Sequence, residues 1–544
     1  MNFNWICMIN EKYIRNYPVP MLFLSLIFLV KSLFLAFYVT PLWAVPDEIG
    51  HYSYARDLAD GKGVPVLGRG GVIGQDVMGY LEKSNNAKPA RNWISQHPPI
   101  YYVIASWPLK IGELVTNDND ILWRIPRIIS ALSGALLLLV LFNTLSVIGL
   151  DATKAAAVAA SIGFIPMVTN LSSGTSHDVT LFLFCAIAIN YFTRYIMDRE
   201  IRCAYWCALW LSLAAGVKVM TPLALSVPMV AILLLELSLP KRVWLKHAVG
   251  ISMTAFFVPL MWMIRNAVIF GKFLYTSETD RAVLPIPLNK SLADYIHLNN
   301  VFDDFSSRFY GMFLDVTPGS GSLLMEGDAA PRHFTMHMYT LAGFPLVAFS
   351  LVVLIASCIC IWKMFDLYLK AFRLDDINLE KINLMAWLGS WAIVSLCKRL
   401  LLLLTIILST SVVVLFFNLN AGGILTTAIV SASIFLGFMS LPLVLLINDG
   451  RDKLFIYGFI IFMVFGSILL IHVYHTYIIL GEVRATQGRY LYPVIPLVLL
   501  SASIALIKMR VPSMLINISV VILACSELLA FICQVIPFYN GASS

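Results

Sequence analysis

Charge is scarce in this sequence, and that scarcity excludes a water-soluble protein. Only 13% of the 544 residues are Asp, Glu, Lys or Arg and 59% are hydrophobic, against about 25% and about 45–50% in an average soluble domain. So few charged side chains cannot cover the surface of a soluble globule. Apolar runs of about 20 residues can instead cross a hydrocarbon layer about 30 Å thick, so the composition predicts an all-α integral membrane protein.

Several chemical signatures are missing as well. The sequence contains no glycine-rich loop of the Walker type, no dinucleotide fingerprint after a strand and no zinc-type spacing of Cys and His. ATP-driven chemistry is therefore unsupported, the sequence requires no cofactor, and no residue pattern supports a divalent metal. The nine cysteines fall in apolar segments or on the predicted cytoplasmic side, so none is placed for a disulfide in an oxidising compartment.

Long runs of low charge predict a single polytopic domain over residues 1–544, a bundle of about 11–13 transmembrane helices. The first run is too long for a cleaved signal peptide and contains Lys31, so we expect it to remain as the first helix. The runs lie at 20–40, 125–148, 153–171, 178–197, 203–219, 221–239, 247–264, 338–362, 399–417, 424–447, 454–480, 491–508 and 513–537.

Basic residues indicate how these spans are oriented. With the N-terminus inside, the inner segments hold 19 Lys and Arg, and the short outer loops hold three. Because short cationic loops stay in the cytoplasm, this predicts a cytoplasmic N-terminus and explains the net charge of +7 without a nucleic-acid partner. Two long segments, 41–124 and 265–337, become outer loops, and loops of such length are uncommon without a function.

An acidic pair follows the first predicted span, in Pro46-Asp47-Glu48-Ile49-Gly50-His51. Proline is favoured at the first helical position and acidic residues suit the first turn, so we expect a helix to begin at Pro46. Its apolar positions recur at helical spacing, which predicts an amphipathic helix on the outer membrane surface with Asp47 and His51 on one face. Two interpretations stay open: the carboxylates stabilise a helix start, or one is a general base held at the lipid headgroups.

Other polar side chains are predicted to lie on the same outer side. His97 precedes two prolines and a second surface helix or re-entrant piece, and it is either a loop hydrogen-bonding group or a ligand. Asp178 opens the fourth span as a cap or as a second acidic site. Lys218, Arg265 and Arg489 lie near outer ends of spans, where each alone suits a lipid headgroup but the set would bind a phosphate.

Five short motifs carry a family resemblance. They are Pro46-Asp47-Glu48-Ile49-Gly50-His51, His97-Pro98-Pro99-Ile100-Tyr101-Tyr102, Ser176-His177-Asp178, Lys218-Val219-Met220-Thr221-Pro222 and Gln487-Gly488-Arg489-Tyr490-Leu491-Tyr492-Pro493. In this order they resemble a family of bacterial multi-pass membrane proteins of unassigned activity, which in turn is similar to the GT-C superfamily of glycosyltransferases. The resemblance spans about residues 20–510, and the acidic pair is its most specific part.

This resemblance implies a GT-C-like bundle in the bacterial cytoplasmic membrane that moves a sugar from a polyprenyl phosphate donor to a cell-envelope glycan or lipid acceptor. The implied base is Asp47, with Glu48 as its competitor. Before the second acidic site, His177 stands where the superfamily usually has another polar residue, which argues against metal binding at that site. The resemblance puts the second acid at Asp178 and the phosphate contacts at Lys218 and Arg489. The full set of predicted substrate-binding residues is His51, His97, Asp178, Lys218, Arg265, Arg489 and Tyr490.

Two other classes of protein remain open from the sequence. A lipid or polysaccharide transporter or flippase would place charged groups at the membrane midplane between interrupted helices. A noncatalytic subunit would bind the lipid carrier alone. The acids and histidines of this chain concentrate in outer loops, which favours chemistry at the membrane interface. In a sugar transfer there, attack of the acceptor in line with the departing phosphate would invert the anomeric centre.

Overall fold

The computed structural model describes the chain in five main stretches and four short pieces. The main stretches are 19–68, 92–237, 239–276, 449–480 and 488–540, and the short pieces are residue 77, residue 309, 311–315 and 332–335. The predicted spans 338–362, 399–417 and 424–447 lie outside the described residues, as does most of the predicted outer loop 265–337.

Within the described residues, six helices are long and apolar enough to cross a membrane, and one bent pair makes a possible seventh span. The six comprise α2 (Val19–Phe34) with η2 (Leu35–Val39), α6 (Asn119–Arg124) with α7 (Arg127–Val147), α10 (His177–Asp198), α13 (Lys241–Phe270), η6 (Gly488–Val494) with α21 (Ile495–Lys508), and α22 (Ser513–Ala530) with η7 (Phe531–Val535) and α23 (Ile536–Tyr539). The prediction of a helical, multi-pass membrane protein is confirmed.

The remaining apolar helices depart from simple spans. The predicted span 153–171 is two helices, α8 (Ala152–Ile162) and α9 (Pro166–Ser172), which meet at 71°. Proline at the first position of α9 cannot continue the hydrogen-bond ladder of α8, which accounts for the break. Two shorter helices, α11 (Ile201–Ala215) and α12 (Met220–Glu236), lie at the predicted spans 203–219 and 221–239, and α20 covers Gly450–Leu480.

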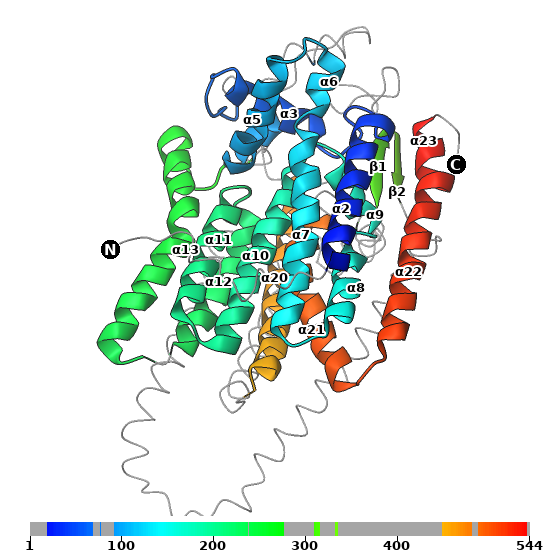
Figure 1. Cartoon of the computed structure of the whole chain (residues 1–544). Coiled ribbons are helices and arrows are strands. Elements are labelled where there is room, and N and C mark those ends of the chain that lie inside the picture. Colours follow the sequence, from blue (N-terminus) through cyan, green and yellow to red (C-terminus); the bar gives the residue numbers. More distant parts are fainter. Residues whose placement is uncertain are drawn as a thin grey trace, which may run out of the picture.

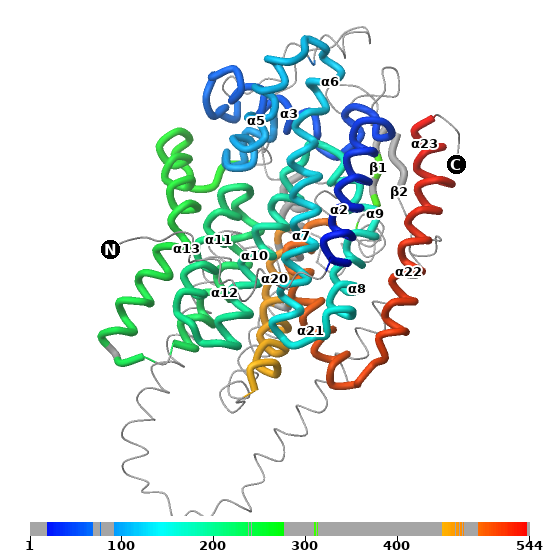
Figure 2. The backbone as a smooth tube through the Cα atoms, viewed as in Figure 1, coloured from blue at the N-terminus to red at the C-terminus, as the bar shows by residue number. Residues whose placement is uncertain are grey.

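The helices form a bundle with a cap at one end. Figures 1 and 2 show α7, α10 and α20 in the middle, with α13 on one side and α22 on the other. Helix α10 packs against α7 and α11, and α13 covers α11 from outside. The cap contains α3 (Glu48–Ala59), η3 (Trp93–Gln96) and α5 (Ile100–Glu113), and the two short strands β1 (Met312–Asp315) and β2 (Arg332–Thr335) pair antiparallel with Met312 opposite Thr335.

Helix α3 is buried on more sides than its sequence indicates. Ten of its twelve residues are buried, where an amphipathic surface helix would leave one face to water. The reason is that α5 packs on one side while η3 packs on another, so closely that a Cβ on Gly50 would lie 2.6 Å from Ile94. The helix begins at Glu48 instead of Pro46 because Asp47 adopts a left-handed backbone conformation, with φ of 63°.

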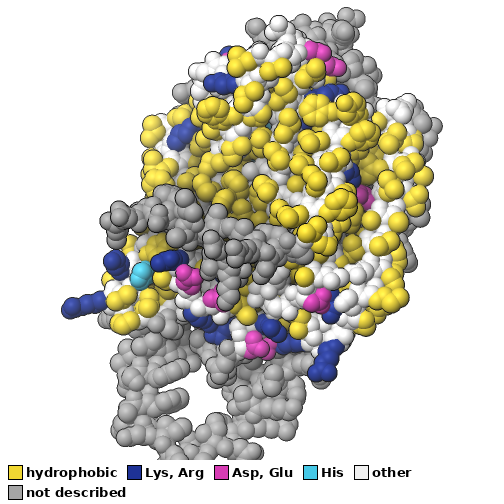
Figure 3. Space-filling view, viewed as in Figure 1, with side chains coloured by type: hydrophobic (Ala, Val, Ile, Leu, Met, Phe, Trp, Pro, Cys, Tyr) yellow, Lys and Arg dark blue, Asp and Glu magenta, His cyan; other side chains and the backbone are white. Residues whose placement is uncertain are grey.

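Hydrophobic side chains cover the middle of the molecule, as Figure 3 shows for one face, while Lys, Arg, Asp and Glu gather toward its lower edge. Large apolar residues are exposed along the outer helices, among them Phe23 of α2, Phe257 of α13 and Val521 of α22. Largely exposed apolar side chains on the outer faces of long helices are typical of contact with lipid.

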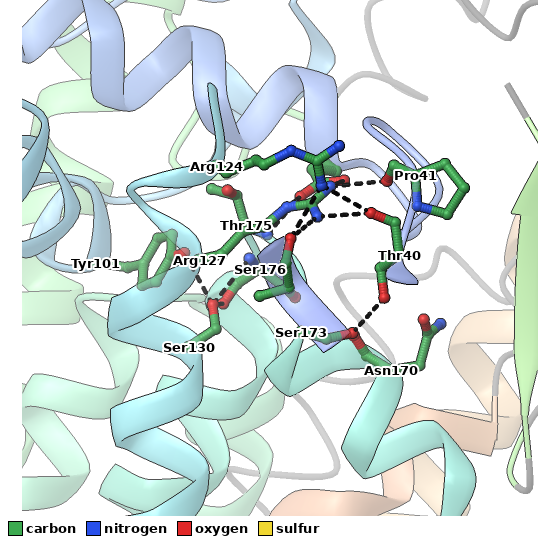
Figure 4. Close-up of polar contacts among 12 residues, drawn as sticks. Thr40, Pro41, Tyr101, Arg124, Arg127, Ser130, Asn170, Ser173, Thr175 and Ser176 are labelled. Atoms are coloured by element: carbon green, nitrogen blue, oxygen red, sulfur yellow. Dashed lines mark hydrogen bonds and ion pairs between the residues drawn. The ribbon is translucent and has the colours of Figure 1, made fainter. Parts of the chain in front are cut away.

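Two arginines fix the end of the first span (Figure 4). Arg127 donates from Nη1 to the carbonyl oxygens of Ala36 and Thr40 and from Nη2 to that of Pro41, over 2.6 to 3.0 Å. Arg124 donates to the same Ala36 and Thr40 carbonyl groups. Carbonyl groups at a helix C-terminus lack helical partners and carry partial negative charge, so the two guanidinium groups hold the turn that leads to Asp47.

A second ion pair joins distant parts of the bundle. The Lys31 ammonium of α2 donates to both carboxylate oxygens of Glu527 in α22 over 2.8 Å, and to the Gly163 carbonyl oxygen and the Thr169 hydroxyl at the break between α8 and α9. The pair gives Lys31 an intramembrane partner, as such a costly residue requires.

Candidate active site

The turn between the first span and α3 carries two unusual backbone conformations. Trp43 and Asp47 both have positive φ, at 66° and 63°. Such conformations cost about 1–3 kcal/mol for residues other than glycine, and Asp and Asn tolerate them best. Trp43 packs its ring against Tyr52 and Trp123, with centroids 5.6 and 5.8 Å away. The strained turn is thus held by aromatic packing, and it presents the Asp47 carboxylate at the start of the helix.

Asp47 lies between an indole and a guanidinium group. Its Oδ1 accepts a hydrogen bond from Trp93 Nε1 over 3.1 Å, and its Oδ2 accepts from Arg489 Nη2 over 3.0 Å. The Asp47 side chain is 33% exposed, although Arg489 is only 4% exposed. A carboxylate that is oriented by two donors and yet open to solvent can still exchange a proton with a bound hydroxyl group.

Glu48 occupies a different environment. Its two oxygens accept from Arg127 Nε and Nη2 over 2.8 and 2.9 Å, and Oε1 also accepts from the Thr175 backbone N–H over 2.7 Å. Glu48 is 1% exposed and Arg127 is fully buried. Three short bonds in a closed environment occupy the carboxylate, so it ties α3 to α7 and to the turn before α10.

Asp178 forms the second acidic position. Ser176 caps α10 by accepting from the Asp178 backbone N–H, as a helix N-terminus requires. The Asp178 carboxylate is left for the cations: Lys218 Nζ lies 3.5 Å from Oδ1, and Arg489 Nε lies 3.4 Å from Oδ2. Lys218 also lies over the ring of Tyr490, 4.5 Å from its centroid. Two carboxylates and two cations therefore balance one another at the same end of the bundle.

Three imidazoles and a phenol adjoin this cluster. The Tyr102 hydroxyl lies 2.9 Å from His51 Nδ1 and 3.0 Å from His177 Nδ1. The His177 ring stands 4.4 Å from that of His51 and 4.7 Å from that of His97, between centroids. Burial, reinforced by the neighbouring His177, holds the pKa of both His51 and His97 well below its usual value. Both rings are therefore neutral near pH 7.

The structure brings most of the predicted site residues together. Asp47, Asp178, Lys218, Arg489 and Tyr490 are linked by direct contacts, and His177 connects them to His51 and His97. Arg265 is placed apart from these contacts. Its guanidinium donates to the Pro65 carbonyl oxygen and to Asn266 and lies over the ring of Trp262.

Three residues at the site were not among the predicted catalytic and substrate-binding residues. Arg127 lies at the outer start of the second predicted span, where a lone cation suits a lipid headgroup, but it is the buried partner of Glu48. A sequence signal existed, because an acidic pair at the membrane boundary needs a counter-ion and Arg127 opens the next span. Trp93 and Tyr102 offered no comparable signal, since an aromatic residue in an outer loop is as compatible with membrane anchoring as with a polar contact.

Among the residues that the structure describes, no three His, Cys, Asp or Glu side chains are arranged to hold a metal ion. The imidazole nitrogens of His51 and His177 that face Tyr102 are already engaged with its hydroxyl.

The fold and the cluster define a class of protein: a multi-pass helical membrane protein with acids, cations and neutral imidazoles at one end of its bundle. No protein-family model and no curated protein sequence matches the chain. Among solved structures it is similar to ArnT from Cupriavidus metallidurans bound to undecaprenyl phosphate, at 13% identity and a TM-score of 0.31, over 94% of this chain and 77% of that one. So remote a likeness carries no weight for the activity of this chain.

Proposed function

We propose that this protein is a membrane glycosyltransferase of the outer face of the cytoplasmic membrane. It transfers a sugar from a polyprenyl phosphate donor to a hydroxyl group of an envelope glycan or lipid, with Asp47 as the base. The observation that carries the proposal is the pairing of the partly exposed Asp47 carboxylate with the buried Arg489 guanidinium, 3.0 Å apart. A base for the acceptor and a cation for the departing phosphate are the two groups that this reaction needs.

The surroundings of the two carboxylates favour Asp47 over Glu48 as the base. Glu48 is enclosed, and its oxygens accept three hydrogen bonds from Arg127 and Thr175. Asp47 accepts two and remains open to solvent on part of its surface. A base must reach the proton it removes within about 3 Å, which an enclosed carboxylate cannot do without disrupting the fold.

The cations suit a phosphate. Arg489 is buried, and its Nη1 has no hydrogen-bond partner among the described residues. A buried donor without a partner costs about 1–3 kcal/mol, and a phosphate oxygen recovers that cost. Lys218 adds a second positive charge, 3.5 Å from Asp178 Oδ1. A phosphate bound to Arg489 competes with Asp47 for the guanidinium, so donor binding itself frees the carboxylate to accept a proton.

The reaction then proceeds by direct displacement. The acceptor oxygen forms a bond to the anomeric carbon while its proton moves to an Asp47 oxygen. The bond between that carbon and the phosphate oxygen breaks, and both of its electrons stay with the phosphate. Because the phosphate is a stabilised leaving group, no strong general acid is needed, and in-line attack inverts the anomeric centre. Lys218 and Arg489 stabilise the charge that develops on the phosphate.

The test is sugar transfer by membranes supplied with a labelled polyprenyl phosphate sugar. Asp47→Asn keeps the shape of the side chain and tolerates the left-handed backbone, and we expect it to reduce transfer at least about 100-fold, the lower range for loss of a positioned base. Asp60→Asn is the matched control, because Asp60 ends the same helix and pairs only with Arg56 and Lys62 in the contacts that the structure describes. Near wild-type transfer by Asp47→Asn would refute the assignment of the base.

One observation favours transport as a second candidate function. The break between α8 and α9 and the Lys31–Glu527 ion pair place charged groups at an interrupted helix, as lipid and ion transporters do. The same membranes separate the two functions. Movement of the intact labelled lipid across the bilayer without sugar transfer would support the transporter, and sugar transfer would support the enzyme.

A further inference from the structure

A polar chain of side-chain contacts, His51–Tyr102–His177–Asp178, joins four polar groups from three helices. His51 belongs to α3, Tyr102 to α5, and His177 and Asp178 to the first turn of α10. His51, Tyr102 and His177 are all buried. The proposed reaction uses Asp47, Lys218 and Arg489 and leaves this polar chain of side chains without a role.

A tyrosine hydroxyl has one proton, so it can donate to only one of the two imidazole nitrogens that flank it. The other nitrogen must carry its own proton and donate to the tyrosine oxygen. The Tyr102 hydroxyl is neutral, because burial raises its pKa well above the usual value. His51 is neutral as well. When His177 is also neutral, one of the two imidazoles carries its proton on Nδ1 and the other carries it on Nε2.

Asp178 determines the direction of the chain. His177 Nε2 lies 3.1 Å from Asp178 Oδ1. Nε2 is outside hydrogen-bond geometry with this oxygen, but a negative charge so near attracts an N–H and repels a lone pair, so the proton of His177 belongs on Nε2. The charge of Asp178 is already balanced by Lys218 and Arg489, which disfavours a third cation on His177. His177 Nδ1 is consequently an acceptor, Tyr102 donates to it, and His51 Nδ1 donates to Tyr102.

We propose that Tyr102 is a positioning residue that fixes His51 as its Nδ1–H tautomer and leaves the lone pair on Nε2. His51 then offers the cluster a neutral hydrogen-bond acceptor. A sugar or acceptor hydroxyl is the matching donor, and this identification of the ligand rests on the proposed function. The tautomer itself follows from the contacts within this polar chain.

Nitrogen NMR of protein labelled with ¹⁵N-histidine tests the proposal, because the two tautomers give different nitrogen shifts. The signals of His51 are identified by their loss in His51→Asn. In the wild type, at neutral pH and without substrate, we expect a proton on His51 Nδ1 and none on Nε2. A proton on Nε2 in the wild-type spectrum would overturn the proposal, and this reading needs no variant of Tyr102.

Tyr102→Phe removes the hydroxyl and keeps the ring, so we expect the Nδ1–H population of His51 to fall at least severalfold. The control is Tyr54→Phe. The Tyr54 ring stacks on that of Tyr102, with 3.8 Å between the ring centroids, but the Tyr54 hydroxyl donates to the His97 carbonyl oxygen. It should leave the tautomer unchanged. An unchanged tautomer in Tyr102→Phe would remove the role of Tyr102. Since the measurement uses no sugar donor, a protein without transferase activity would still give either result.

Discussion

At the residue scale, the two adjacent carboxylates face different partners because Asp47 has a left-handed backbone just before the helix that Glu48 begins. Asp47 with its positive φ points toward Arg489, whereas Glu48 starts the helix and points toward Arg127. Sequence reasoning placed the pair correctly after the first span and left the choice between them open. Nothing in the local sequence distinguishes them, because the distinction comes from arginines 79 and 442 residues away.

Glu48→Gln should therefore destabilise the protein. It leaves the Arg127 charge buried without its partner, and breaking a buried pair typically costs about 3–5 kcal/mol. We expect a lower unfolding temperature in detergent. Glu113→Gln, which alters a partly exposed pair with Arg56, should change stability by less than about 1 kcal/mol. Equal shifts for the two variants would contradict the structural role of Glu48.

The buried imidazoles predict a loss of stability in mild acid. His97 has a folded-state pKa well below 6.5, so the unfolded chain binds more protons as the pH falls below about 6.5. Stability is then full above that pH and declines below it, by up to about 1.4 kcal/mol per pH unit for each such histidine. Unfolding measured between pH 7 and 5 should show a shallower decline in His97→Gln than in the wild type.

At the scale of elements, apolar run length predicted the helices well and their packing poorly. The runs at 20–40, 178–197 and 513–537 correspond to α2, α10 and the helix containing α22. The run at 153–171 concealed a 71° break, although Pro166 marked it. The apolar pattern of α3 predicted one buried face. It could not predict that α5 and η3, which come later in the sequence, bury the other sides of the helix as well.

At the same scale, the Lys31–Glu527 ion pair links α2 to α22. Lys31→Met or Glu527→Leu alone should destabilise the protein by several kcal/mol, because each leaves a charge without its partner. The double variant should recover much of that loss, since a packed apolar pair is often as stable as a buried ion pair. Additive losses in thermal unfolding would show that the partners do not interact.

At the scale of the whole molecule, the charge asymmetry predicts which end faces outward. Lys62 follows α3 at the cap, and Lys508 ends α21 at the opposite end (Figure 1). We expect Lys62→Cys to react with an impermeant maleimide in intact cells, and Lys508→Cys to react only after permeabilisation. The wild type measures the background from native thiols. The reverse pattern would place Asp47 on the cytoplasmic side and refute a reaction at the outer face.

The contact between Asp47 and Arg489 joins residues 442 positions apart. A ribosome that has made Asp47 must therefore add 442 further residues before the guanidinium exists, and the helix that carries Arg489 must be inserted before the two side chains can meet. Prematurely terminated chains would display the carboxylate without its counterion. Under the proposed function, a nascent protein that lacks Arg489 would have the base without its cation, so sugar transfer would begin only after Arg489 is made.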